Sequence, residues 1–163
     1  MKLSGFNEFR RLAADHNVIP MVRERLSDFY SPVSLAAKLC DQNRFFIYES
    51  VEGGEKWGRY SILGFNIERV LVVADGKTLL RCGDTESELP GNPMDAIQRE
   101  LARYRLACVP GLPRFYGGAV GYFSFESVRY FERCGNIKTP HTAGFDDIHL
   151  FLTDDLVVFD TLS

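Results

Sequence analysis

Aromatic and β-branched residues gather most densely between Arg44 and Phe65, in the stretch RFFIYESVEGGEKWGRYSILGF. The run from Phe45 to Tyr48 predicts a mostly buried strand, because such side chains favour a pleated surface. Side chains alternate between the faces of a strand, so this strand should end with Glu49 on one face and Ser50 on the other. Two glycines then allow a tight turn, and residues 60–65 predict a second strand. The pattern therefore predicts two strands whose connection begins with polar side chains beside aromatic surface.

Helix-start signals and helical spacing predict four further segments. Ser31-Pro32 and Asn92-Pro93 each place a capping side chain before a proline at the first helical position, where no amide donor is needed. The helices that we expect cover residues 4–15, 31–42, 93–104 and, as a short turn, 126–131. In the third of these helices the predicted apolar face consists of Met94, Ile97, Leu101 and Tyr104.

The remaining apolar runs read as strands. Asp75-Gly76 favours a two-residue type I′ turn, so it predicts a hairpin of residues 68–74 and 77–82. Residues 18–25 predict an edge strand because Pro20 cannot donate to a ladder, and residues 83–91 predict a polar loop. Other predicted strands are residues 116–125, 148–153 and 156–160. Hairpins mixed irregularly with helices predict an α+β fold with a largely antiparallel sheet and packed helices.

Composition narrows the class of protein. A chain of 163 residues is long enough for one domain with its own core. A net charge of −3 provides no basic surface for nucleic acid or an anionic membrane. The N-terminus lacks the apolar segment of a signal peptide, and no run approaches the length of a membrane span. We therefore expect a cytoplasmic protein that binds neither nucleic acid nor membrane.

Candidate chemical groups are sparse. The cysteines and histidines lack the short spacings of metal sites or nucleophile pairs, so we expect no metal site and no catalytic residue. The acidic doublets Asp146-Asp147 and Asp154-Asp155 are typical of solvated turns. Arg59 lies among apolar residues and should need a carboxylate partner, for which Glu49 and Glu52 are the candidates.

Two long blocks carry a resemblance to a known family. The sequence ESVEGGEKWGRYSILGF resembles the block that follows the LL of LLES in anthranilate synthase component I. GLPRFYGGAVGYFSFESVRYFE, from Gly111 to Glu132, is similar to a second block of the same family, in the same order. The resemblance extends from about Asn17 to Asp160, which is nearly the whole chain.

The resemblance implies a domain assignment. Residues 1–163 would be the N-terminal, regulatory and scaffolding domain of a two-domain enzyme, whose C-terminal chorismate-binding catalytic domain lies outside this chain. The full-length enzyme would be a lyase that converts chorismate and ammonia or glutamine to anthranilate and pyruvate, the first committed step of tryptophan biosynthesis. It would use Mg²⁺, and a glutamine amidotransferase subunit (component II) would supply the ammonia. This chain alone would be inactive.

The resemblance also implies an inhibitor site. The strand that ends in LLES lines the family's pocket for L-tryptophan, the feedback inhibitor, and by position this assigns Tyr48, Glu49 and Ser50 to it. Ser50 would contact the polar end of the amino acid. Tyr48 stands where the family usually has a leucine, and it should face the same way as Ser50. Judged from the residues alone, a serine at a strand end more often bonds to nearby backbone.

The sequence is compatible with two other functions. Aminodeoxychorismate synthase component I, of the folate pathway, shares the fold and the chorismate chemistry. A stand-alone amino-acid-binding module is the alternative from a different class.

Overall fold

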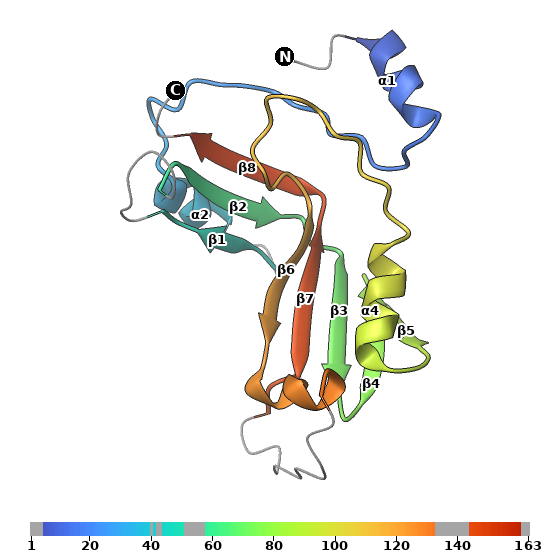
Figure 1. Cartoon of the computed structure of the whole chain (residues 1–163). Helices are drawn as coiled ribbons and strands as arrows, with labels where there is room; N and C mark the ends of the chain where they lie inside the picture. Colours follow the sequence, from blue (N-terminus) through green and yellow to red (C-terminus); the bar gives the residue numbers. More distant parts are fainter. Residues whose placement is uncertain (1–4, 40, 42–43, 51–57, 133–143, 161–163) are drawn as a thin grey trace. The chain divides into compact units, whose positions relative to one another are not determined.

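A computed structural model describes the chain except for residues 1–4, 40, 42–43, 51–57, 133–143 and 161–163 (Figure 1). The backbone divides into two compact units, and each unit consists of segments that are far apart in the sequence. The first unit contains Met1–Ile67, Tyr104–Gly117 and Asp154–Ser163; the second contains Glu68–Arg103 and Gly118–Thr153. Each unit has its own antiparallel sheet. The predicted α+β class with largely antiparallel pairing is confirmed.

The first unit has a three-stranded sheet in the order β1-β2-β8. Both pairs of neighbouring strands are antiparallel. Leu63 in the central strand is fully buried. The elements of this unit are α1 (Phe6–Ala13), α2 (Pro32–Leu39), β1 (Phe46–Tyr48), β2 (Tyr60–Phe65) and β8 (Asp155–Asp160).

The predicted second helix is confirmed as α2, which lies beside β2 (Figure 1). Ser31 and Ser34 exchange hydrogen bonds at its start: the Ser34 amide donates to Ser31 Oγ at 3.1 Å, and the Ser31 amide donates to Ser34 Oγ at 2.9 Å. This reciprocal cap satisfies two amides at the helix start. The strand that follows is shorter and less buried than predicted, because two of its three residues are half-buried and Tyr48 is exposed.

The predicted edge strand over residues 18–25 is wrong. Val18 alone pairs there, in a parallel bridge with Leu106, and residues 19–25 form no strand. Pro20 has no amide to donate, and a strand needs a partner of matching length to satisfy its backbone. Leu12, Ala107 and Val109 form a small core, and Ile19 packs against it.

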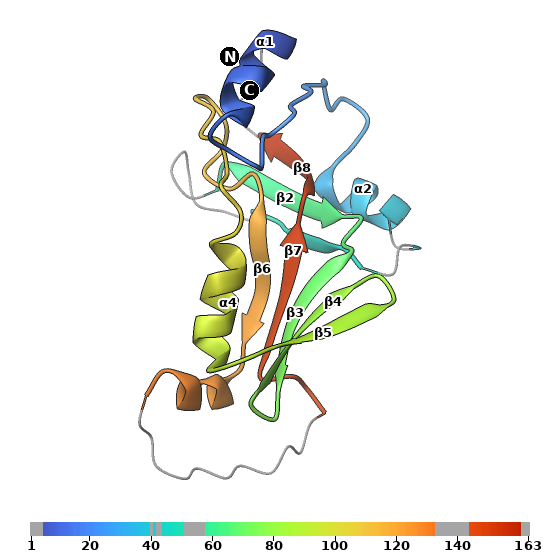
Figure 2. The same cartoon turned by 90° about the vertical axis from the view of Figure 1, so that its right-hand side faces the viewer.

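The second unit has a five-stranded antiparallel sheet in the order β5-β4-β3-β7-β6 (Figures 1 and 2). All four residues from Val70 to Val73 in β3 are buried, together with Ile148, Leu150 and Leu152 of β7. The elements are β3 (Arg69–Ala74), β4 (Lys77–Cys82), β5 (Thr85–Leu89), α4 (Pro93–Leu101), β6 (Gly118–Phe123), the 3₁₀ helix η1 (Phe125–Tyr130) and β7 (Ile148–Thr153).

The predicted β3–β4 hairpin is confirmed. Asp75 and Gly76 have φ values of 50° and 77°, and positive φ at both central residues is what a type I′ turn requires. The predicted loop over residues 83–91 is wrong, since β5 pairs with β4 from Thr85 to Leu89. Four of the five β5 side chains are exposed. A strand at the edge of a sheet tolerates a polar sequence without apolar alternation, which is why the pattern did not reveal it.

The predicted third helix is confirmed as α4, which lies along one face of this sheet (Figure 2). Asn92 caps it by accepting the Met94 amide proton at 2.9 Å. The buried residues of α4 are Pro93, Ala96, Ile97 and Glu100, so of the predicted apolar face Ile97 alone is fully buried. None of the helices in the described ranges combines the length and the apolar character that crossing a membrane would require.

Candidate functional site

The three residues assigned to the inhibitor site lie together at the end of β1, and we refer to Tyr48, Glu49 and Ser50 as the rim. Tyr48 is 55% exposed, Glu49 is exposed, and Ser50 is half-buried. The Ser50 side chain is therefore not sealed in the interior.

The Ser50 backbone is held by a neighbouring strand. The Ser50 amide donates to Ser61 Oγ at 3.1 Å. Ser61 belongs to β2 and is 3% exposed. This hydrogen bond joins the rim to the interior of the three-stranded sheet.

Phe46 of β1 contacts the rim residue Tyr48 and pairs with Gly64 of β2. The Phe46 and Tyr48 rings lie 5.6 Å apart between centroids at an interplanar angle of 51°, which confirms that alternate residues of β1 share a face. Phe46 pairs with Gly64 on β2, and a Cβ at Gly64 would lie 2.1 Å from Phe46 Cε1. The glycine therefore leaves the space that the Phe46 ring occupies over β2.

An ion pair joins Arg59, the residue before β2, to Asp160, the last residue of β8. Arg59 donates from Nε and Nη2 to the two carboxylate oxygens of Asp160, at 2.7 and 2.6 Å. This hydrogen bond to Asp160 raises the pKa of the Arg59 guanidinium above its usual value. The sequence predicted Glu49 or Glu52 as the partner. Glu52 lies outside the described residues, and the partner that the structure reveals is 101 positions away in the chain.

In the second unit, Asp147 corrects the prediction of solvated acidic doublets, because it is 2% exposed. Its carboxylate accepts hydrogen bonds from Arg129 Nη2 at 2.5 Å and from the Tyr130 hydroxyl at 2.6 Å. Tyr130 also accepts the Gly76 amide at 3.2 Å. The bond to Asp147 raises the pKa of Arg129, and burial raises the pKa of the Tyr130 phenol. These contacts join η1 to β7 and to the β3–β4 turn.

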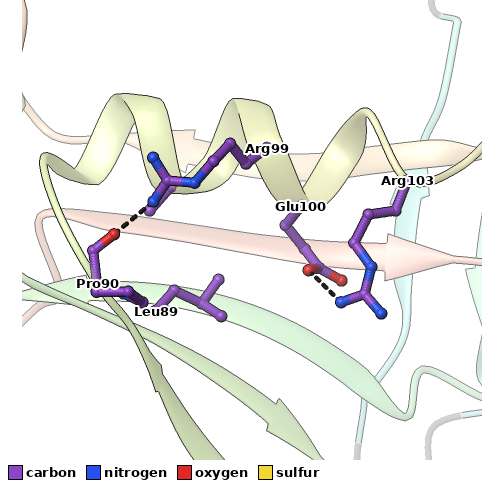
Figure 3. Close-up of a pocket in the computed structure, with 6 residues that line it drawn as sticks. Leu89, Pro90, Arg99, Glu100 and Arg103 are labelled. Atoms are coloured by element: carbon purple, nitrogen blue, oxygen red, sulfur yellow. Dashed lines mark hydrogen bonds and ion pairs between the residues drawn. The ribbon is translucent and has the colours of Figure 1, made fainter.

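A pocket of about 130 Å³ lies beside α4, and Figure 3 shows how the side chains that line it are arranged. Glu100, which is 4% exposed, points beneath the helix and accepts a hydrogen bond from Arg103 Nη1 at 2.9 Å. Arg99 extends the other way and donates to the carbonyl oxygen of Pro90. The two guanidinium groups diverge, so the pocket does not form a clamp for one anion. Its remaining lining residues are Leu89 and Ala96.

The described residues contain no group of three or more histidine, cysteine or acidic side chains arranged to hold a metal ion. The His149 ring makes two contacts within the protein: Nδ1 lies 2.8 Å from Asp146 Oδ2, and the ring stacks on Tyr122.

Comparison with known proteins identifies relatives along nearly the whole chain. The chain is 45% identical over 160 residues to anthranilate synthase component 1 of Pseudomonas aeruginosa, a match that covers 96% of this chain and 32% of the relative. The proteins of the same name from Neisseria gonorrhoeae and Acetivibrio thermocellus are 39% and 38% identical, again over 96% of this chain. A comparison with models of protein families gives no match.

A solved structure agrees with the sequence relatives. The fold resembles anthranilate synthase component I from Streptococcus pneumoniae with a TM-score of 0.54 and 25% identity, over 86% of this chain and 30% of that protein. The two sheets and these matches identify the chain as a relative of a multicomponent biosynthetic enzyme. Along nearly its whole length it is similar to anthranilate synthase component I proteins, and it spans about a third of the length of the curated relatives that it matches.

Proposed function

We propose that this chain is the regulatory and scaffolding part of an anthranilate synthase component I, and that its rim forms part of a site for L-tryptophan as feedback inhibitor. The observation that carries the assignment is the 45% identity over 96% of the chain to an anthranilate synthase component 1. The assignment of residues 1–163 to one N-terminal domain stays part of this proposal.

The proposed activity belongs to the longer polypeptide. That enzyme is a lyase, which forms anthranilate and pyruvate from chorismate in the cytoplasm with Mg²⁺ and with ammonia from a component II amidotransferase. The catalytic and Mg²⁺-binding residues lie outside this chain. The chain alone does not turn over chorismate.

The rim offers the groups that an amino acid with an aromatic side chain requires. The Glu49 carboxylate suits an ammonium group, and the Ser50 hydroxyl can donate to a carboxylate or accept from the ammonium. The exposed face of Tyr48 offers apolar surface for an indole ring. Inhibition requires tryptophan to bind one state of the enzyme more tightly than another, so the rim must differ between those states.

Replacing Ser50 by phenylalanine in the full-length enzyme tests this proposal. Ser50→Phe removes the hydroxyl and fills the space beside Tyr48, so we expect the inhibition constant for tryptophan to rise by about tenfold or more, equivalent to about 1.4 kcal/mol. The kcat and KM for chorismate should stay unchanged. The measurement is steady-state anthranilate formation at a series of tryptophan concentrations.

Ser87→Phe is the matched control, because Ser87 is an exposed serine on β5, far along the chain from the rim. It should leave inhibition as it was. Unchanged inhibition in Ser50→Phe would remove Ser50 from the site. Product analysis addresses the rival activity: aminodeoxychorismate in place of anthranilate would overturn the assignment, although the relatives reported above give it no support.

A further inference from the structure

The hydrogen bonding between β1 and β2 changes character at the rim. The backbone pairing runs from Phe46↔Gly64 to Tyr48↔Ile62 and ends there. Two residues later the acceptor is a side-chain oxygen and not a backbone carbonyl, because the Ser50 amide donates to Ser61 Oγ. Ser50 is therefore positioned by a hydroxyl rather than by the backbone of the neighbouring strand.

Ser61 is buried in the three-stranded sheet and paired on β2. It pairs with Phe159 of β8 as the second pair of a six-residue antiparallel ladder, and it is 3% exposed. The adjacent pair of this ladder joins Tyr60 to Asp160, whose carboxylate accepts two hydrogen bonds from Arg59. A serine in a central strand contributes no apolar packing, and burying a hydroxyl is unfavourable unless it is hydrogen-bonded. Its bond to the rim supplies that partner.

We propose that Ser61 is a positioning residue for the inhibitor site: its hydroxyl fixes the Ser50 backbone and thereby aims the rim side chains at the bound amino acid. This inference rests on the proposed function of the rim. Ser61 does not touch the inhibitor and takes no part in chorismate turnover. Loss of its hydroxyl leaves the Ser50 amide without this acceptor, so Ser50 samples other positions and the affinity for tryptophan falls.

Threonine and valine provide a matched pair of substitutions at this position. The two side chains have nearly the same shape, both favour strands, and they differ in the hydroxyl. Any effect of the added methyl group is therefore common to both variants. Ser61→Ala removes the hydroxyl without adding volume and serves as the third variant.

The experiment measures tryptophan inhibition, kcat and KM for chorismate, and the melting temperature of each variant in the full-length enzyme. Ser61→Thr should keep the inhibition constant within about twofold of the unchanged enzyme. Ser61→Val and Ser61→Ala should raise it by about tenfold, the factor expected for the loss of one hydrogen bond that orders the site. In all three variants kcat and KM should be unchanged.

Two results overturn the proposal. One is equal inhibition of the threonine and valine variants; the other is a parallel loss of inhibition, turnover and melting temperature, which would make Ser61 a general packing residue. Ser50→Phe, measured alongside, distinguishes a failure of the role of Ser61 from a failure of the inhibitor site itself. If Ser50→Phe relieves inhibition and Ser61→Val does not, the role of Ser61 fails while the site stands. If Ser50→Phe has no effect either, the site itself is wrong.

Discussion

Single buried polar residues form hydrogen bonds that join separate segments of this chain. Asp147 accepts hydrogen bonds from Arg129 and Tyr130, and Ser61 accepts one from Ser50. Each lies in a sequence where the hydrophobic pattern assigns it no role. Because a buried polar group without a partner is costly, each such residue identifies a contact that the fold requires.

Removing the Asp147 carboxylate should destabilise the chain strongly. Asp147→Ala leaves the Arg129 guanidinium and the Tyr130 hydroxyl without their shared acceptor. Breaking a buried pair in this way costs about 3–5 kcal/mol of unfolding free energy. Urea denaturation of the purified chain, followed by circular dichroism, measures this loss.

Glu86→Ala is the control for that experiment. Glu86 and Arg81 form an ion pair at 2.7 Å, but their side chains are 49% and 40% exposed. Exposed pairs contribute about 0–1 kcal/mol, so this variant should unfold at nearly the original urea concentration. Equal midpoints for the two variants would show that the Asp147 pair does not hold η1 to the sheet.

At the scale of elements, two glycines of the five-stranded sheet serve different purposes. Gly76 has a φ of 77° in the β3–β4 turn, and a Cβ there would meet no atom within 4 Å. Gly121 lies in β6, and a Cβ there would lie 1.8 Å from the His149 carbonyl oxygen of β7. The first glycine satisfies a backbone conformation, whereas the second permits two strands to approach each other.

Alanine substitutions at these glycines should therefore differ in cost. Gly76→Ala should lower the free energy of unfolding by about 1–2 kcal/mol, the cost of a left-handed conformation for a residue with a Cβ. Gly121→Ala should cost more, about 3 kcal/mol or above, because its clash is with backbone that pairs in the ladder. Urea denaturation of both variants measures the two costs. A smaller loss for Gly121→Ala would show that β6 can shift away from β7.

At the scale of the whole molecule, the chain spans about a third of the length of its curated relatives. Its two units are each assembled from segments distant in the sequence. The rim belongs to the first unit and is partly exposed. We expect residues beyond this chain to complete the proposed inhibitor site.

Tryptophan affinity should therefore depend on the rest of the polypeptide. Calorimetric titration should give a dissociation constant at least about tenfold higher for the isolated 163-residue chain than for the full-length enzyme, because part of the contact area is missing. Phenylalanine titrated into both proteins controls for unspecific aromatic binding. Equal tight binding to both would contradict a site shared between the chain and the remainder.

Local signals predicted much of the fold. Ser31-Pro32 and Asn92-Pro93 located two helices, and Asp75-Gly76 located a hairpin, because caps and turns depend on neighbouring residues. The edge strand predicted around Pro20 and the loop predicted over residues 83–91 were wrong, because strand formation depends on the partner that the fold supplies. The rim residues came from the family resemblance, and their role in binding stays a prediction.

By itself, the sequence located the two capped helices and the β3–β4 hairpin, and two long blocks of it carry the family resemblance. Only the tertiary structure decided that Arg59 pairs with Asp160, that Asp147 is buried, and that Ser61 holds Ser50. These contacts join residues between 11 and 101 positions apart. Local periodicity reflects the interactions of near neighbours, whereas a buried polar pair depends on which distant strands the whole fold brings together.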